Sequence, residues 1–301
     1  MEEERISRKA KLIRELVAKF NGTPFIKDHI IGDHRGDSDF DKEFKYPDHI
    51  STTKVSVGSL RMELAEAAEP KSDKVVLQLH GGGYVGAFKN NYRRLAGYYI
   101  EVGVAAVLTP DYRVAPEHVF PAALHDGLKA YDWLLQRGYR EDQIIFAGDS
   151  AGGGLALAMC HYLIDRERPL PAGVIAMSPW ADLAASGPSY RENYDVDPVF
   201  GNSGDDLIFE NPYPGHSDVR HPYISPAYGD FSEFPPMLVQ VGTREMLLSD
   251  AQTVAEKARK AGVRIRYTEY EGMFHVFQIA GHVMEESKRA WAEIAGFISR
   301  I

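Results

Sequence analysis

A serine lies at the centre of a glycine-rich turn, in a setting that can make its hydroxyl a nucleophile. Ser150 stands between Gly148 and Gly152 in a Gly-x-Ser-x-Gly pattern. The apolar run at 144–148 predicts a buried strand before the turn, and the Ala- and Leu-rich run at 151–165 predicts a helix after it. A serine on such a turn presents its hydroxyl outside the sheet. Ser150 is therefore the candidate nucleophile, and an ordinary strand-to-helix turn is the alternative.

A serine hydroxyl needs a base to take its proton and an acid to orient that base. His275 follows the last predicted strand, and Gly272 permits a tight turn before it, so His275 is the candidate base. The acid is open between Glu245, in the loop after the preceding strand, and Asp250, which falls in the first turn of a predicted helix; Asp182 follows an earlier strand. We expect Glu245, because the loop brings it within reach of the sheet edge.

The tetrahedral intermediate of such a reaction carries an oxyanion, which needs preorganised N–H donors. The His-Gly-Gly-Gly run at 80–83 follows a predicted strand, and its glycines can expose backbone N–H groups because no side chain blocks the approach. We expect the N–H groups of Gly81 and Gly82 to hold the oxyanion together with that of Ala151, the residue after Ser150. A phosphate loop would end in Gly-Lys-Ser/Thr, which is missing here.

The elements that must position these residues alternate between strand and helix, which is typical of a largely parallel sheet covered on both faces. The predicted strands are 51–57, 61–67, 74–79, 104–108, 144–148, 173–177, 237–241 and 263–270. The predicted helices are 3–20, 91–102, 121–137, 151–165, 249–261 and 283–301. The proline-rich stretch from about 182 to 235 has a weaker pattern, so we expect it to leave the sheet.

Composition narrows the function classes. With 34 Lys and Arg against 43 Asp and Glu in 301 residues, the formal charge is −9, and no basic patch favours nucleic-acid binding. No run of 18 apolar residues predicts a membrane span, and the first residues lack the apolar core of a secretory signal. The single cysteine, Cys160, excludes an internal disulfide and is expected to be buried. We therefore expect a cytoplasmic protein, and no spacing of His, Cys, Asp and Glu suggests a metal site.

Five ordered motifs together resemble the bacterial hormone-sensitive-lipase-like (family IV) carboxylesterases. They are His80-Gly-Gly-Gly-Tyr84, the Asp111-Tyr-Arg-Val-Ala-Pro-Glu-His118 run to Ala123, Gly148-Asp-Ser-Ala-Gly-Gly153, Ser178-Pro-Trp-Ala-Asp182 and Gly272-Met-Phe-His275. The resemblance spans about residues 75–280. It departs at the acid loop, where the family usually has Asp-Pro-Leu-x-Asp and this chain has Glu245-Met-Leu-Leu-Ser-Asp250.

The resemblance implies an α/β-hydrolase fold and hydrolysis of short-chain acyl esters through an acyl-enzyme, without a cofactor. It implies cap helices from residues 1–45 and a catalytic domain over 46–301, with a cap insertion at about 182–235. The implied partner is a small-molecule ester, and a homodimer is a family-level expectation. Tyr84 and Phe88 are candidates for the substrate pocket, with a core role as the alternative.

Two rival functions remain. The same triad could transfer acyl groups or deacetylate a small molecule. A non-catalytic ligand-binding protein can also use this fold, but the relatives of that kind have lost the histidine that His275 supplies here.

Overall fold

The fold is built on an eight-stranded sheet with the order β1-β2-β4-β3-β5-β6-β7-β8. The computed structural model describes residues 6–20, 38–202 and 207–301. The strands are β1 (Ile50–Val57), β2 (Leu60–Ala67), β3 (Val75–Leu79), β4 (Ala106–Asp111), β5 (Ile144–Asp149), β6 (Gly173–Met177), β7 (Met237–Gly242) and β8 (Ile265–Tyr270). Strands β4, β3 and β5 to β8 run parallel, and β2 pairs antiparallel with both β1 and β4. The predicted largely parallel sheet is confirmed.

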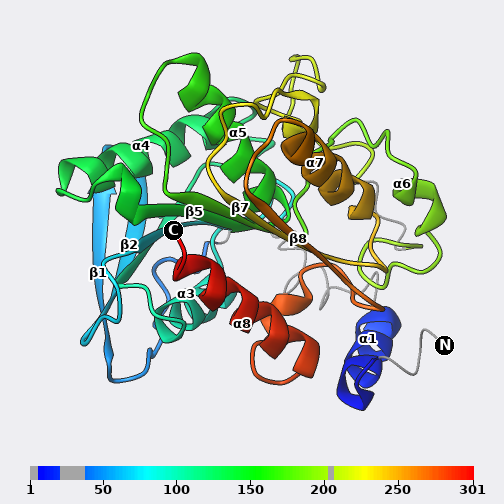
Figure 1. The fold of residues 1–301 in the computed structure, drawn as a ribbon, viewed down its shortest axis with the longest axis horizontal. Coiled ribbons are helices and arrows are strands. Elements are labelled where there is room, and N and C mark those ends of the chain that lie inside the picture. Colours follow the sequence, from blue (N-terminus) through cyan, green and yellow to red (C-terminus); the bar gives the residue numbers. More distant parts are fainter. Residues whose placement is uncertain (1–5, 21–37, 203–206) are drawn as a thin grey trace.

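Helices cover both faces of the sheet, so the central strands are buried on both sides. Figure 1 shows α3 and α8 on one face and α4, α5 and α7 on the other. The helices are α1 (Arg8–Phe20), α3 (Asn90–Glu101), α4 (Ala122–Gln136), α5 (Ala151–Asp165), α6 (Ser189–Glu192), α7 (Leu248–Lys260) and α8 (Glu285–Ile298), and the short 3₁₀ helices are η3 (Glu141–Gln143), η4 (Pro226–Tyr228) and η5 (Phe277–Ala280). All residues of β3, β5 and β6 are buried, as parallel strands between helical layers require.

Strand β4 ends later along the chain than the sequence predicts. The predicted strand covers residues 104–108. The structure continues β4 to Asp111. Its pairing with β3 ends at Leu108, so beyond that point only β2 lies alongside it, and Pro110 faces Met62 there. The N–H that Pro110 lacks therefore costs no ladder bond on the β3 side.

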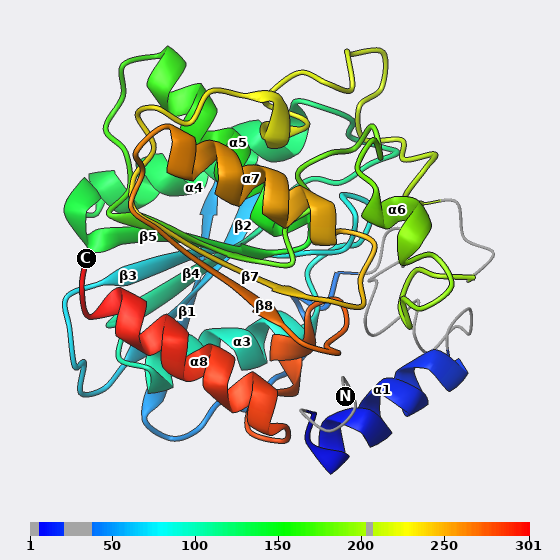
Figure 2. The ribbon, with the colours of Figure 1, turned by 45° about the vertical axis from the view of Figure 1, so that its right-hand side comes forward.

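Two segments outside the sheet lie near the ends of the late strands. Figures 1 and 2 place α1 and α6 at one end of the sheet, beside the loops that follow β7 and β8. The Arg14 guanidinium on α1 donates to the Gly272 carbonyl after β8 at 3.1 Å. The segment 182–235 leaves the sheet between β6 and β7 as expected. Parts of the predicted N-terminal cap, residues 1–5 and 21–37, lie outside the described residues.

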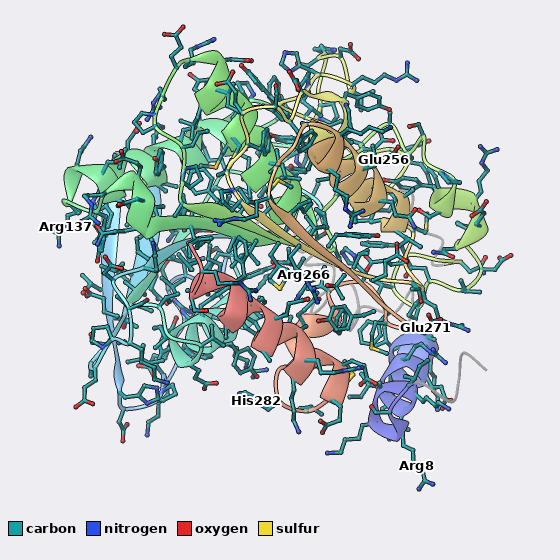
Figure 3. All side chains as sticks on the ribbon, in the orientation of Figure 1. Arg8, Arg137, Glu256, Arg266, Glu271 and His282 are labelled. Carbon is teal, nitrogen blue, oxygen red and sulfur yellow. The ribbon has the colours of Figure 1, made fainter. Side chains whose placement is uncertain are left out.

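Many charged side chains lie on the outer surface. Charged side chains such as Arg8, Arg137 and Glu256 are exposed and project from the helices into solvent (Figure 3). Among the described residues, no helix combines the length and the apolar character that a bilayer span requires. Cys160 is buried in α5 and unpaired, as predicted.

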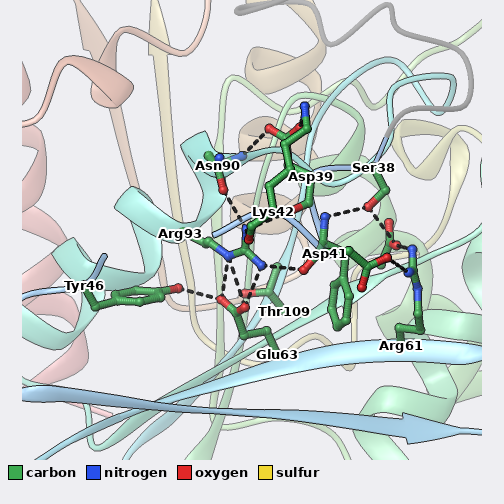
Figure 4. Close-up of polar contacts among 12 residues, drawn as sticks. Ser38, Asp39, Asp41, Lys42, Tyr46, Arg61, Glu63, Asn90, Arg93 and Thr109 are labelled. Carbon is green, nitrogen blue, oxygen red and sulfur yellow. Dashed lines mark hydrogen bonds and ion pairs between the residues drawn. The ribbon is translucent and has the colours of Figure 1, made fainter. Parts of the chain in front are cut away.

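A buried arginine fixes the segment that enters the sheet from the N-terminal side (Figure 4). Arg93 on α3 is 2% exposed. Its guanidinium pairs with the Glu63 carboxylate on β2 at 2.7 Å. The same guanidinium donates to the carbonyls of Phe40 at 2.9 Å and Asp39 at 2.9 Å. The segment around Asp39 is thereby tied to both α3 and β2.

Replacing Arg93 with Ala should destabilise the fold strongly, because it leaves the Glu63 carboxylate buried without its cation. We expect the free energy of unfolding to fall by about 3–5 kcal/mol, measured by urea denaturation. Arg94→Ala is the matched control, since Arg94 is exposed on the same helix, and it should change stability by less than about 0.5 kcal/mol. Equal stability of the two variants would contradict the assignment.

Candidate active site

Ser150 lies in a sharp turn where backbone atoms of neighbouring segments come very close. It lies between β5 and α5 with φ of 52° and ψ of −124°, a strained conformation for a residue with a side chain. A Cβ atom at Gly152 would lie 2.0 Å from the Leu79 carbonyl oxygen, and one at Gly148 would lie 2.4 Å from the Gly152 carbonyl carbon. Glycine is therefore required at both positions, and the predicted strand, turn and helix are all present.

The histidine and the glutamate expected from the sequence are in contact. The Nδ1 atom of His275 lies 2.8 Å from Glu245 Oε2. His275 is 3% exposed and Glu245 is 0% exposed, so water does not compete for this contact. With Nδ1 committed to the carboxylate, Nε2 is the nitrogen that remains for exchanging a proton with a hydroxyl.

The loops that carry these two residues are joined through their backbones. The Thr243 N–H donates to the Tyr270 carbonyl at 3.1 Å, and the Arg244 N–H donates to the Met273 carbonyl at 2.9 Å. The parallel pairing of β7 with β8 brings the two loops to the same edge of the sheet. Glu245 and His275, which lie 30 positions apart, therefore meet because their strands are neighbours.

The second oxygen of the Glu245 carboxylate is also held. Its Oε1 atom accepts hydrogen bonds from the Ser178 hydroxyl at 2.8 Å and from the Gly242 N–H at 2.6 Å. The Ser178 oxygen in turn accepts the Val276 N–H at 3.1 Å. These donors fix the plane of the carboxylate, which orients the His275 ring.

Asp250, the alternative acid, has a different set of partners. Its Oδ2 atom accepts the N–H groups of Ala181 and Asp182, both at 2.8 Å, and the Tyr190 hydroxyl at 3.0 Å. Burial and the nearby Asp182 charge raise the pKa of Asp250 well above its ordinary value. Asp250 therefore holds the loop after β6, and Glu245 is the carboxylate that contacts His275.

The glycine loop after β3 divides into donors with different surroundings. In the part of the chain that the structure describes, the N–H groups of Gly82, Gly83 and Ala151 donate no hydrogen bond. The Gly81 backbone lies against the Asp149 carboxylate and lowers the pKa of Asp149 against the effect of burial, and a Cβ atom at Gly81 would lie 2.3 Å from Asp149 Oδ2. Gly81 therefore packs against the strand that carries Ser150, and its role as an oxyanion donor stays a prediction.

Asp149 is an unusual neighbour for a nucleophile. It is 4% exposed, and its Oδ1 atom has no hydrogen-bond partner among the described residues. Burial raises the pKa of Asp149 to about 7, against the opposing effects of His275 and of the N–H groups of Asp149 and Gly81. The carboxyl group therefore changes its charge near neutral pH.

The two aromatic candidates for the substrate pocket are both fully buried. Phe88 packs edge-on against Phe40, with ring centroids 5.8 Å apart, and lies under the Arg93 guanidinium at 4.9 Å. It belongs to the core beneath α3, which is the role that the sequence left open. Tyr84 is stacked on Tyr213 from the 182–235 segment at 3.8 Å.

Sequence reasoning missed Ser178 and Asp149 as partners of this site. Ser178 follows β6 with φ of 46°, and a serine at a strand end gives no signal that its hydroxyl reaches Glu245. Asp149 occupies the variable position of the Gly-x-Ser-x-Gly pattern, so nothing marked it as part of the chemistry. In the described ranges, no group of three or more His, Cys, Asp or Glu side chains is arranged to hold a metal ion.

Comparisons with known proteins point in one direction. A family model described as alpha/beta hydrolase fold matches residues 76–279. An acetyl-hydrolase of Streptomyces hygroscopicus is 38% identical over 246 residues, which cover 82% of this chain and 81% of that protein. An esterase of Acinetobacter venetianus is 32% identical over 78% of this chain and 77% of that protein. The crystal structure of an esterase from the bacterial hormone-sensitive lipase family matches with a TM-score of 0.86 at 32% identity, over 98% of both chains.

The pKa of Asp149 predicts a pH-dependent contribution to stability. Between its ordinary value of 3.8 and about 7, the folded state keeps a proton that the unfolded chain has released. The free energy of unfolding contributed by this group therefore falls as pH rises through that window. Asp149→Asn cannot titrate, so the stability of the wild type relative to this variant should decrease from pH 4 to pH 7.

Urea denaturation of both proteins at several pH values measures this difference. Asp218→Asn is the control, because Asp218 is exposed and should give a difference that does not change with pH. A constant difference between the wild type and Asp149→Asn would show that Asp149 is ionised throughout the window.

Proposed function

We propose that this chain, which belongs to the bacterial hormone-sensitive-lipase family of alpha/beta-hydrolase-fold esterases, hydrolyses short-chain acyl esters with Ser150 as its nucleophile. The chain is a carboxylic ester hydrolase, as its named relatives are. One observation supports the choice of residues. The strained serine turn follows β5, and the buried His275–Glu245 pair lies in the loops after β7 and β8 of the same parallel sheet. This is the combination that activates a hydroxyl for acyl transfer.

In the acylation step, the Ser150 oxygen attacks the ester carbonyl carbon while His275 Nε2 takes the hydroxyl proton. The resulting imidazolium is stabilised by Glu245 at Nδ1. The same proton then passes to the alkoxide leaving group, and the C–O bond of the ester breaks. A water molecule, deprotonated by His275, attacks the acyl-enzyme in the second step, releases the acid and restores the serine.

The developing oxyanion needs donors that are not already engaged. We propose that the N–H groups of Gly82 and Ala151 supply them, together with that of Gly83, because these three groups donate to no described residue. The N–H group of Gly81, which the sequence also predicts as a donor, stays a candidate for the same role, with the Gly81 backbone packed against Asp149.

The acyl group is proposed to be short. The relative from Streptomyces hygroscopicus is named an acetyl-hydrolase, which favours an acetyl group over a long chain. The same observation supports a second candidate, deacetylation of a small molecule or transfer of its acetyl group. The two differ in whether water or another acceptor attacks the acyl-enzyme.

We propose that residues 1–45 and the segment 182–235 form a cap over Ser150. Support comes from the contact of α1 with the loop after β8 and from the stacking of Tyr213 on Tyr84. A cytoplasmic location is supported by the single unpaired cysteine, and a homodimer is supported by the family resemblance. Sedimentation velocity of the purified protein tests the homodimer.

Hydrolysis of p-nitrophenyl esters from acetate to long acyl chains tests the proposed function. The wild type should turn over short chains fastest. Ser150→Ala should lose about 10⁶-fold in kcat, because no other group replaces the nucleophile. No turnover by the wild type on any chain length, or equal rates for the two proteins, would overturn the proposal and favour a ligand-binding role.

The choice of acid predicts opposite behaviour of two amide variants. Glu245→Gln should lower kcat by about 10³- to 10⁴-fold, because the amide no longer stabilises the imidazolium and favours the wrong tautomer. Asp250→Asn should keep most turnover, because Asp250 contacts backbone N–H groups and the Tyr190 hydroxyl, not His275, and an Asn side-chain oxygen can still accept those hydrogen bonds. Steady-state kinetics with p-nitrophenyl acetate distinguish the two, and the reverse result would move the acid to Asp250.

A further inference from the structure

The segment between β6 and β7 reaches back to the loop that carries Glu245. At the end of α6, the Asn193 side-chain amide donates to the Thr243 carbonyl at 3.1 Å and to the Glu245 carbonyl at 2.8 Å. Both acceptors belong to residues 243–249, named here the acid loop. One side chain of the insertion therefore holds the backbone of the candidate acid directly.

Asp197 makes a second link between the insertion and the acid loop. Its Oδ2 atom accepts the N–H of Met246, the residue after Glu245, at 2.7 Å. Its Oδ1 atom accepts the N–H groups of Val199 at 2.8 Å and Phe200 at 3.1 Å. The carboxylate is 3% exposed. Burial raises the pKa of Asp197 to about 6, against the opposing effects of these three N–H groups and of His275. The carboxylate is therefore charged at pH 7 and above, and the three donors fix its position.

Packing beside these hydrogen bonds leaves little freedom for the insertion to shift. The Ser249 N–H donates to the Ser189 hydroxyl at 2.9 Å, and the Ser189 hydroxyl donates to the Met246 carbonyl at 2.6 Å. A Cβ atom at Gly187 would lie 2.1 Å from the Ser249 hydroxyl oxygen. The insertion and the acid loop therefore form one packed unit.

The same stretch of the insertion reaches the histidine. The Phe200 ring packs against the His275 ring, with centroids 4.8 Å apart. Three carboxylates act on this imidazole: Glu245 by direct contact at Nδ1, and Asp149 and Asp197 through their charges. Because Asp197 does not occupy a ring nitrogen, it can stabilise the imidazolium without competing with Glu245.

We propose that Asp197 is a positioning residue for the Glu245–His275 pair, acting together with Asn193. The proposal rests on the proposed function, since it assigns to the insertion the placement of the catalytic acid. Asp197 holds the acid loop at Met246, orders the chain that presses Phe200 on His275, and adds negative charge near the imidazole. Of these three contributions, Asn193 makes only the first: it also holds the acid loop in place.

Two variants separate these contributions. Asp197→Asn removes the negative charge. It also replaces one carboxylate oxygen, which accepts a backbone N–H, with an amide NH₂ that cannot accept one. We expect kcat for p-nitrophenyl acetate to fall by roughly 10-fold or more, with KM changed less than about twofold. The acid limb of the kcat/KM profile should move to lower pH, because the imidazolium of His275 loses a stabilising charge.

Asn193→Ala releases the acid loop without changing any charge. Its kcat should also fall while KM stays within about twofold of the wild type, but the acid limb of its pH profile should not move. Asp195→Asn is the matched control, because Asp195 is an exposed carboxylate on the same segment whose contact is to the Asn202 side chain at 3.0 Å. It should behave as the wild type in rate and in pH profile.

Titration of Ser150 with a fluorophosphonate, carried to completion, gives the fraction of correctly folded enzyme, and each kcat is divided by that fraction. If the corrected kcat of Asp197→Asn and Asn193→Ala equals that of the wild type and no acid limb moves, the two residues are structural and the proposal is wrong. That result leaves the proposed function intact, because Ser150→Ala tested in the same assay fails only if the nucleophile assignment is wrong.

Discussion

The contact between the Gly152 backbone and the end of β3 is the constraint on which the site depends. There is no room for a Cβ atom at this point, where one would lie 2.0 Å from the Leu79 carbonyl oxygen. The contact allows α5 to begin directly after Ser150 while β3 stays paired with β5 through Leu79 and Gly148. The glycine loop that follows β3 then starts beside the serine. The candidate nucleophile and the proposed oxyanion donors are neighbours because β3 and β5 pair in the sheet.

Four buried carboxylates near the site have different tasks, and their partners decide which. Glu245 alone contacts the Nδ1 atom of His275. Asp250 accepts backbone N–H groups after β6, Asp197 accepts one from the acid loop, and the Asp149 carboxyl is left with one unpartnered oxygen. Burial alone would raise the pKa of every one of them. Hydrogen-bond donors do not cancel this effect for Asp197 and Asp250, because each accepts three hydrogen bonds and the pKa of each is still raised.

The sequence was informative where the chemistry is local. A Gly-x-Ser-x-Gly turn between a strand and a helix needs only adjacent residues, and Ser150 was located from them. The parallel sheet was predicted from alternating patterns, although β4 runs on to Asp111, past the predicted end at Leu108. Glu245 was preferred to Asp250 because of its place in the loop, and its contact with His275 has the expected partner.

What the sequence could not give are contacts between distant segments. The Ser178 hydroxyl reaches Glu245 across 67 positions, and Asn193 reaches the same residue across 52. The close approach of Gly81 to Asp149 is likewise a contact between the loop after β3 and the end of β5, and a glycine run in the sequence does not reveal it.

The loops of a parallel sheet are placed by their strands only at their first residues, and a residue further along needs support from elsewhere. Glu245 lies beyond the end of β7 at Gly242, so the sheet alone does not fix its backbone. Asn193 and Asp197 provide that support from the insertion, as Arg93 does for the segment around Asp39. In both places a polar side chain binds carbonyl or N–H groups of irregular backbone, which packing of apolar side chains could not orient. The segment proposed as a cap is thus also part of the framework of the site it would cover, because the same residues 189–200 contact both the acid loop and His275.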